Sequence, residues 1–408
     1  MIWMIALRVA IGLAVVLAWI ATPSTAARSE TGGTFYITPT GAGSRDGSSW
    51  ESAGSLVNLP VLIGRAGPGG KVLIRADMGD YTITRQIDMQ IGGEPDRPVV
   101  VMGVDGAGRP MNATLVGTRA DPYRPDGSPG SAVFRLGRGA NHLRFQHLSF
   151  RNQGNGCFYV SGDIRDLAIE HVDAANVRRF FENYAARKAI SATIDGLTIR
   201  NVEVRGFSKG AIRLQYDTHN VTLEDIVGDS ERQDRDNFAE GIALEGTVHD
   251  VLLRRVSMRN SQDTLHEYWN GDGFTAEKDT YRIRFEDTVA SGNTDGGYDL
   301  KSNATMLLRA VAEDNKHNFK LWGKDVTIDA CVGRGPHRRG GTGVQDQMEI
   351  LKGADVTVTR CEFSDSDPMT TVFHVETDAR LWVEDTRVSK HPTAANSLVE
   401  QGGTLLLK

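Results

Sequence analysis

A short apolar motif recurs along the chain, and it constrains the possible folds more than any other feature of the sequence. Its copies begin at Leu143, Leu167, Leu197, Val221, Val251, Ile283, Met306, Val326, Val356 and Leu381. In most copies the first, third and sixth residues are apolar, and two copies carry threonine at the sixth position. This pattern is the period-two alternation of a β-strand with one bend, not the stripe of a helix.

Each copy is followed by a polar turn and then by a second short apolar run, such as GAIRLQ, EGIALEG or GYDLKS. The repeat has roughly 20–32 residues, which is too short for one unit to bury its own apolar face, so neighbouring units must stack. Stacked strands of this kind are parallel and about 4.8 Å apart. The sequence therefore predicts an all-β fold, a right-handed parallel β-helix of ten or more coils. A β-sandwich would need hairpins, and a leucine-rich repeat would show a fixed asparagine.

The N-terminal part of the chain departs from the regular repeat. We expect one domain over residues 33–408, with a cap and opening coils at 33–140 and regular coils at 141–408. A cap is expected because terminal coils otherwise expose apolar edges. Helical content should be low, with helices near Ser48–Arg65 and around Val177–Ala189.

The first residues have the pattern of an export signal. Arg8 precedes the apolar run Val9–Ala21, which is too short to span a bilayer comfortably. Small residues then offer a cleavage site, so we interpret residues 1–27 as a signal peptide. The alternative is an uncleaved N-terminal anchor. The first interpretation predicts a secreted or periplasmic protein with no membrane association after cleavage.

Charge and cysteine content exclude some classes of protein and leave others open. A net charge of −6 argues against a nucleic-acid-binding protein, which usually has a basic face. We expect a monomer, the default for a capped solenoid. The chain has three cysteines, and Cys331 and Cys361 occupy the same place in two repeats. We expect these two to pack as small core residues, with a disulfide as the alternative that export would permit.

Aligning the second runs places their residues in two columns. The inward column is Ile212, Ile242, Phe274, Tyr298, Phe319, Met348 and Phe373. Side chains alternate along a strand, so the residue after each of these points outward. The outward column is Arg213, Ala243, Thr275, Asp299, Lys320, Glu349 and His374.

The segment Asn270–Gly323 carries three versions of one motif, and it is the most informative part of the outward surface. Asp272, Asp295, Asp299 and Lys320 should converge there across three coils. Carboxylates are the ligands that Ca²⁺ prefers. The lysine lies among apolar residues, and burial lowers the pKa of an amine towards that of a useful base. The competing interpretation is an ordinary mixture of surface ion pairs.

A cation beside a base suits proton abstraction from a uronic acid. The proton at C5 is adjacent to a carboxylate, so its removal builds charge next to an existing negative group. A divalent cation on that carboxylate offsets the charge. A base then takes the proton, and the glycosidic oxygen at C4 leaves.

The motifs NGDGF, NTDGGYDL and HNFKLWG resemble the active-site coils of the family 9 polysaccharide lyases, which are calcium-dependent β-helix enzymes that include pectate lyases. The resemblance implies that Asp272, Asp295 and Asp299 bind calcium and that Lys320 is the catalytic base. The family has a second aspartate where this chain has Gly296. This departure leaves three consequences open: weaker calcium binding, an ion shifted towards the substrate, or a substitute ligand such as Glu240 or Glu267.

Basic side chains are needed to hold an anionic polysaccharide substrate. The candidates for substrate binding are Arg213, Lys301, Lys316, His317 and Arg334. The basic loop Gly333–Gly343 lies next to the Lys320 coil, and Tyr268 and Trp269 are candidates to stack on sugar rings. For each residue alone, an ordinary surface or core role is the competing interpretation.

The sequence therefore predicts a calcium-dependent polysaccharide lyase that acts on a uronate-containing polymer. Three alternatives remain open. A uronate C5 epimerase would use the same proton abstraction. A glycoside hydrolase would use Asp295 and Asp299 as acid and base, which leaves Lys320 without a role. A non-catalytic polysaccharide-binding or export protein would bind glycan without turnover.

Overall fold

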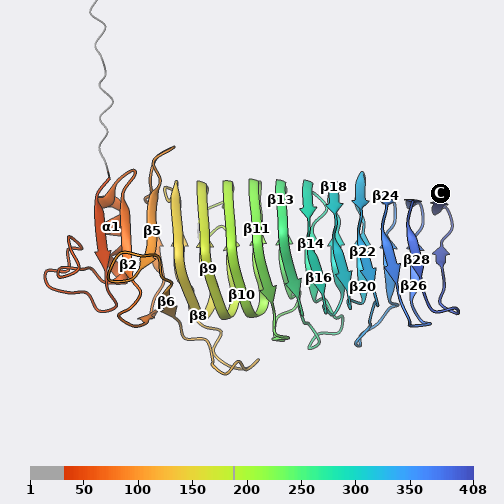
Figure 1. Ribbon diagram of the computed structural model, residues 1–408, viewed down its shortest axis with the longest axis horizontal. Helices are drawn as coiled ribbons and strands as arrows, with labels where there is room; N and C mark the ends of the chain where they lie inside the picture. Colours follow the sequence, from red (N-terminus) through yellow and green to blue (C-terminus); the bar gives the residue numbers. More distant parts are fainter. Residues whose placement is uncertain (1–31, 187–188) are drawn as a thin grey trace, which may run out of the picture. The chain divides into compact units, whose positions relative to one another are not determined.

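The computed structural model describes residues 32–186 and 189–408. Within them, Gly32–Lys408 form one compact unit, and its thirty strands belong to one continuous sheet. The described residues contain a single α-helix, α1 (Leu59–Ala66), preceded by a short 3-10 helix at Leu56–Asn58. All strand pairings within the sheet are parallel, and successive coils lie side by side in Figure 1. The predicted parallel β-helix is confirmed.

The strands form three columns, one for each face of a coil. Three long strands pass through all of them: β8 (Leu143–Val160), β9 (Ile164–Asn183) and β10 (Ile194–Leu214). The remaining strands of the first column are β1 (Thr34–Ile37), β2 (Lys71–Arg75), β5 (Val99–Val104), β11 (His219–Asp229), β13 (His249–Arg259), β15 (Tyr281–Glu286), β18 (Asn303–Leu308), β21 (Val326–Asp329), β24 (Asp355–Thr359), β27 (Arg380–Glu384) and β30 (Thr404–Leu407). From β8 to β27 these are the runs that the repeat predicts as strands. The copy predicted to start at Met306 is one residue out of register, because Thr305 pairs with Ile283 and Val326 and Leu307 enters the core.

The second and third columns follow after each bend. The second contains β3 (Tyr81–Thr82), β6 (Ala113–Val116), β16 (Val289–Ser291), β19 (Val311–Glu313), β22 (Val332–Arg334), β25 (Glu362–Ser364) and β28 (Arg387–Ser389). The third contains β4 (Ile87–Met89), β7 (Phe134–Leu136), β12 (Glu240–Leu244), β14 (Asp272–Ala276), β17 (Gly296–Leu300), β20 (His317–Leu321), β23 (Asp346–Ile350), β26 (Thr371–Val375) and β29 (Ser397–Val399). The third column carries the predicted site residues.

The bend between the first and second columns has a local cause. One residue of most repeats adopts the left-handed conformation there, as do Asn201, Asp225 and Asp287 with φ of 53°, 54° and 53°. Asn and Asp tolerate this conformation better than most residues. The bend explains why the apolar positions of the repeat shift from third to sixth instead of continuing the alternation.

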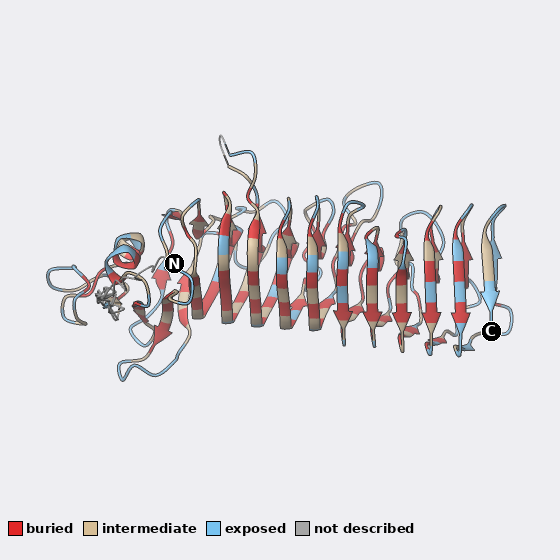
Figure 2. Cartoon of the chain, turned by 90° about the horizontal axis from the view of Figure 1, so that it is seen from above, coloured by how far each residue is buried: buried red, intermediate tan, exposed pale blue. Residues whose placement is uncertain are grey.

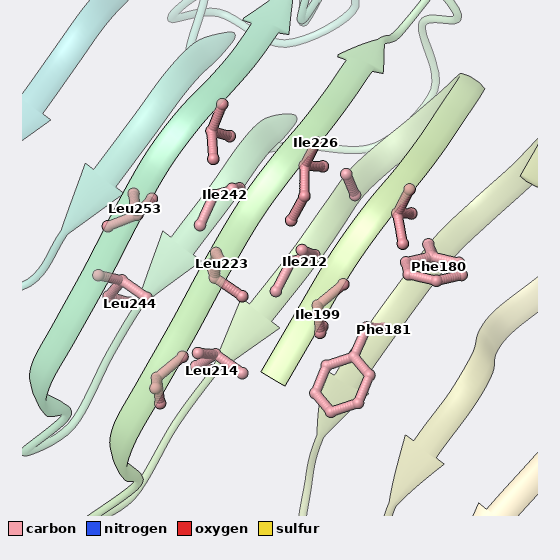
Figure 3. Close-up of a cluster of buried hydrophobic side chains, with 14 of the residues drawn as sticks. Phe180, Phe181, Ile199, Ile212, Leu214, Leu223, Ile226, Ile242, Leu244 and Leu253 are labelled. Atoms are coloured by element: carbon pink, nitrogen blue, oxygen red, sulfur yellow. The ribbon is translucent and has the colours of Figure 1, made fainter. Parts of the chain in front are cut away.

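The apolar core runs through the centre of the coils. The predicted inward column is confirmed: Ile212 pairs with Ile242, Ile242 with Phe274, and Phe274 with Tyr298. All of these residues are buried, and the rings of Tyr298 and Phe319 stack with centroids 5.3 Å apart. Figure 2 shows buried stripes repeated from coil to coil, and Figure 3 shows the aliphatic side chains that fill the space between columns. Stacking thus buries the face that a single coil leaves exposed.

The two predicted helices have different outcomes. Within Ser48–Arg65, the structure forms a helix only at the end, where α1 buries Leu59, Leu62 and Ile63 against the first coils. The helix expected around Val177–Ala189 is wrong, because β9 continues to Asn183. Its last residues pair with β10, and Phe180 and Phe181 are fully buried. Tertiary pairing overrides the local helical preference of this segment. The capping role of the N-terminal part stays a prediction.

Cys331 and Cys361 form a disulfide between adjacent coils, at a sequence separation of 30. The expectation that both are free core residues is therefore wrong. The two residues follow β21 and β24, which are paired strands, so the repeat brings their side chains together. Cys157 is free and buried.

The predicted signal peptide at residues 1–27 lies outside the described residues. Among the residues that are described, no helix has the length and apolar character needed to cross a membrane. Export therefore stays a prediction of the sequence.

Candidate active site

Three neighbouring strands of the third column, β14, β17 and β20, bring the predicted site residues together. Asp299 pairs in register with Lys320 on the next coil, and Asp272 is the first residue of β14. Asp295 lies immediately before β17, where its backbone N–H donates to the carbonyl of Gly271 at 2.8 Å. Because side chains alternate along a strand, Asp299 and Lys320 lie on the outer side of the column.

Asp272, Asp295 and Asp299 form a compact cluster of carboxylates. One oxygen of each residue lies within 4.8 Å of the others, and the residues are only 4%, 1% and 7% exposed. Burial raises the pKa of Asp272 well above its usual range, and the charges of Asp295 and Asp299 raise it further. Buried negative charge of this kind is costly unless a cation offsets it.

This carboxylate cluster fits a hard divalent cation. All of its donor atoms are carboxylate oxygens, and Ca²⁺ takes about six to eight oxygen ligands in flexible geometry. Glu240 is in register with Asp272 on the preceding coil, and its charge also raises the pKa of Asp272. Of the two substitute ligands considered from the sequence, Glu240 is therefore brought next to the cluster.

Asp295 is the most heavily contacted member of the cluster. Lys320 Nζ lies 3.1 Å from its Oδ2, and Lys316 Nζ lies 3.2 Å from its Oδ1. The Tyr268 hydroxyl donates to the same carboxylate, at 3.2 Å from Oδ1. Burial raises the pKa of Asp295, but the charges of Lys320, His317 and Lys316 outweigh burial and lower it. The carboxyl group is therefore held ionised.

The environment of Lys320 holds a proton on its amine. Burial lowers the pKa of Lys320, but the charges of Asp295 and Asp299 raise it by more. The amine lies 3.8 Å from Asp299 Oδ2, and that carboxylate also accepts a hydrogen bond from Trp322 Nε1 at 2.9 Å. Lys320 can therefore act as a base only when the carboxylate charge around it is offset.

Gly296 has a physical explanation in this site. Its backbone N–H donates to Asp272 Oδ1 at 2.5 Å. A Cβ at position 296 would lie 2.9 Å from that oxygen and 3.3 Å from the Asp299 Cβ. The Asp272 carboxylate thus occupies the space that a side chain at position 296 would need.

The five predicted substrate-binding residues lie in different surroundings. Lys301 pairs with Glu277 at 2.8 Å and lies 3.6 Å from Asp299. Lys316 and His317 are buried, at 2% and 3% exposure, and both contact the Asp295 carboxylate. Both belong to the site, but as groups that hold carboxylates in place.

Arg213 and Arg334 lie further from the carboxylate cluster. Arg334 is on β22 in the second column, where it lies 3.7 Å from Glu313. Arg213 is on β10 in the third column and makes a two-pronged contact with Glu245 at 2.7 and 2.6 Å. Three register steps separate Arg213 from Asp299, which is roughly 14 Å at about 4.8 Å per step.

A cavity of about 450 Å³ opens on the third column beside β9 and β10. Its cationic lining residues are Arg178, Arg179, Lys209 and Arg213. Part of this charge is compensated, because Arg178 lies 2.6 Å from Asp236. Lys209 instead donates to the backbone carbonyl of Phe238 at 3.1 Å. Arg179 also pairs with Glu182, and Arg213 pairs with Glu245. The cavity is therefore a concave surface lined mainly by ion pairs, on the same face as the carboxylate cluster.

Tyr268 and Asp346 are site residues that the sequence analysis did not identify in these roles. Tyr268 was considered for sugar stacking, whereas its hydroxyl contacts Asp295 and its ring lies 4.9 Å from Lys316 Nζ. Asp346 is in register with His317, and its Oδ1 lies 2.9 Å from His317 Nδ1. A second alignment three residues before the outward column would have found Asp346. Nothing in the repeat predicts Tyr268, because it lies in a loop.

No protein-family model and no curated protein matches the chain. Among solved structures, the A-module of the mannuronan C-5 epimerase AlgE4 from Azotobacter vinelandii is similar, with a TM-score of 0.50 and 12% identity. That match covers 84% of this chain and 93% of the module. At this identity the likeness shows the parallel β-helix fold alone.

Two lyase structures are also similar. Pectate lyase Pel9A has a TM-score of 0.47 and 14% identity, with 90% of this chain and 78% of that chain covered. An alginate lyase from Paenibacillus sp. has a TM-score of 0.45 and 11% identity, with 91% and 99% covered.

Proposed function

We propose that this chain is an exported polysaccharide lyase that cleaves a uronate-containing polysaccharide by calcium-assisted β-elimination. In this proposal Asp272, Asp295 and Asp299 bind calcium, and Lys320 is the catalytic base. The observation that carries the proposal is the pairing of Asp299 with Lys320 in register, next to a buried carboxylate cluster. A base and a cation site thus share one outward face.

The reaction needs a base, an offset for negative charge and a proton for the leaving oxygen. Lys320 takes the proton from C5, the electron pair forms a C4=C5 double bond, and the bond from C4 to the glycosidic oxygen breaks. Asp272, Asp295 and Asp299 would hold Ca²⁺, whose charge would offset that of the aspartates around Lys320 and that of the sugar carboxylate. Asp295 and Asp299 hold the amine in place through contacts of 3.1 and 3.8 Å.

Tyr268 is the group that we assign to protonate the leaving oxygen. Its hydroxyl donates a hydrogen bond to Asp295, and the centre of its ring lies 5.8 Å from Lys320 Nζ. Burial raises the pKa of Tyr268 to about 12, so the phenol keeps its proton until the leaving group accepts it. We expect Tyr268→Phe to lower kcat by about 10²-fold or more with little change in KM. A KM effect alone would limit Tyr268 to substrate binding.

The cavity on β9 and β10 offers arginine and lysine side chains that can exchange their present carboxylate partners for those of an anionic substrate. A polymer lying along the third column would reach from Asp299 and Lys320 to Arg213, roughly 14 Å away. Arginine and lysine side chains bind carboxylates through charge-assisted hydrogen bonds. The proposal therefore takes a uronate polymer, and Arg213 as one of the groups that hold it.

The test is ultraviolet absorbance of the unsaturated uronyl group during incubation with a panel of polymers. The panel contains polygalacturonate, alginate, glucuronan and acidic exopolysaccharides, each with Ca²⁺ and with EDTA. We expect a calcium-dependent rise on at least one polymer. Reducing ends without a rise would indicate a hydrolase, and inversion at C5 without chain cleavage would indicate an epimerase.

Lys320→Ala should reduce the absorbance rate by at least about 10²-fold, because the general base is lost. The matched control is Lys324→Ala, which removes an exposed lysine near the end of the same coil. Far-ultraviolet circular dichroism checks that both variants keep the β-helix. Near-normal turnover by Lys320→Ala would show that another group is the base.

A further inference from the structure

A second cluster of potential metal ligands lies beyond the carboxylate cluster on the same column. His317 is in register with Asp346 on the next coil. Three residues further along these strands, Glu349 on β23 is in register with His374 on β26. Two imidazoles and two carboxylates from three successive strands therefore face one another, and we call these four residues the histidine–carboxylate cluster.

The spacing of these side chains matches the ligands of a small cation. His317 Nδ1 lies 2.9 Å from Asp346 Oδ1 and 3.5 Å from Glu349 Oε2. His374 Nδ1 lies 3.7 Å from Glu349 Oε1. A tetrahedral Zn²⁺ with bonds of about 2.0–2.1 Å places its ligands about 3.3 Å apart. His317, Asp346 and Glu349 each offer a ligand atom within 4.8 Å of the others. His374 is placed beside Glu349 and would complete the set by a rotation of its side chain.

Several polar atoms of the cluster have no hydrogen-bond partner among the described residues. Asp346 is 0% exposed and its Oδ2 is unpartnered, and both ring nitrogens of His374 are unpartnered at 9% exposure. The carboxylates nearest to His374 lie at 3.7 Å (Glu349) and 3.5 Å (Glu400). A buried polar atom without a partner is costly, and a bound ion is one of the ways in which a native site satisfies it.

The charge of the cluster also calls for a cation. The carboxylates of Asp346 and Glu349 both lie against His317. The other ring nitrogen of His317, Nε2, lies 3.7 Å from Asp295 Oδ1. The negative charge of the cluster is therefore not fully offset by the side chains around it.

We propose that His317, Asp346, Glu349 and His374 bind a divalent transition-metal ion of the zinc class. Mixed imidazole and carboxylate ligands suit zinc and its neighbours, whereas calcium prefers oxygen ligands alone. Four protein ligands make a closed site, which is typical of a structural metal. The ion ties β20, β23 and β26 together and fixes His317 beside Asp295. This site is separate from the proposed calcium site and does not depend on lyase activity.

The experiment measures binding of zinc and cobalt to the full-length chain, without any assay of turnover. The protein is stripped with chelator, exposed to one of the two metals, dialysed and analysed for metal content per chain. We expect one retained Zn²⁺, and a visible Co²⁺ spectrum of the intensity typical of tetrahedral coordination. Excess Ca²⁺ should not displace either ion. Retention of less than about 0.2 equivalents would overturn the proposal.

Two variants locate the site, and two controls test its specificity. Asp346→Asn and His374→Gln should each weaken zinc binding by at least tenfold. Of the two, His374→Gln should disturb folding less, because His374 lies nearer the surface than Asp346. His391→Gln, at a half-buried histidine outside the cluster, and Asp299→Asn, in the carboxylate cluster, should leave zinc binding unchanged. Unchanged binding in His374→Gln, or weaker binding in His391→Gln, would contradict the assignment. The former result would show that the ion binds without His374.

Discussion

At the scale of single residues, the candidate site depends on which carboxylates have a cationic partner. Asp295 contacts Lys316 and Lys320, whereas Asp272 accepts a backbone N–H from Gly296. Burial acts on both aspartates, and the difference in partners moves their pKa values in opposite directions. Neighbouring carboxyl groups with such different environments are a common feature of functional sites.

Gly296→Asp should weaken the protein instead of improving the site. The new Cβ would meet Asp272 Oδ1 at 2.9 Å, and the added charge would repel three existing carboxylates. We expect a loss of about 1–3 kcal/mol in the free energy of unfolding, because the Asp272 contact with the Gly296 N–H is disturbed. Urea denaturation measures the change.

Gly296→Ala carries the same Cβ without the charge, so it separates crowding from repulsion. If Gly296→Asp were as stable as the parent protein and bound calcium more tightly, the explanation given for the glycine would be wrong.

The pKa of Glu240 makes stability depend on pH. Burial raises this pKa to about 7, and Glu245 contributes in the same direction. Between about pH 4.5 and 7 the folded protein keeps a proton that the unfolded chain has released, so stability falls as pH rises through this window. We expect a loss of about 1–3 kcal/mol from Glu240.

The measurement is the urea midpoint at pH 5 and at pH 8 for the parent protein and Glu240→Gln. The variant cannot titrate at position 240, so it should lose less stability between the two pH values. Glu384→Gln, at an exposed glutamate on β27, is the matched control. Equal pH dependence in the parent and in Glu240→Gln would contradict the assigned shift.

At the scale of elements, the repeat predicted strands, columns and register well because each follows from spacing alone. The alternation of apolar residues placed Phe274, Tyr298 and Phe319 inside and Asp299 and Lys320 outside. Local composition was less informative. The segment after Val177 contains good helix formers, yet it is a strand because its phenylalanines complete the core between β8 and β10.

The loops and the fine pairing of charges could not be predicted in the same way. The Tyr268 loop follows no repeat, so its contact with Asp295 was not visible in the sequence. Arg334 was placed near the site because it follows Lys320 in sequence, but it lies on the second column with Glu313. Which lysine contacts which aspartate depends on side-chain geometry, and spacing does not encode it.

At the scale of the whole molecule, each coil is stabilised mainly by its two neighbours. Core residues, the buried asparagine contact between Asn293 and Asn315 at 2.8 Å, and the parallel backbone ladder all join adjacent coils. Stability in such a stack is approximately a sum of coil and nearest-neighbour terms. A cross-link between two coils therefore stabilises the interface between those two coils.

Removing the Cys331–Cys361 disulfide should destabilise the molecule. The bond closes a loop with a sequence separation of 30 residues, and the chain-entropy account assigns about 3–4 kcal/mol to a loop of this size. The variant Cys331→Ala/Cys361→Ala should therefore unfold at a lower temperature. Thermal denaturation with and without reducing agent gives the measurement.

Reducing agent should lower the melting temperature of the parent protein and leave that of the double variant unchanged. Equal melting temperatures for the oxidised parent and the double variant would show that the disulfide contributes nothing to the folded state.

The positions of the outward side chains on the third column are set by the backbone. Each coil offers two outward positions three residues apart, and backbone pairing, not the side chains, fixes where they lie. The paired positions are Glu240 and Ala243, Asp272 and Thr275, Gly296 and Asp299, His317 and Lys320, Asp346 and Glu349, and Thr371 and His374. A substitution at one coil therefore leaves the backbone of the next coil in place, and its effect is set by the side chains directly above and below it, as at Gly296 and Asp272.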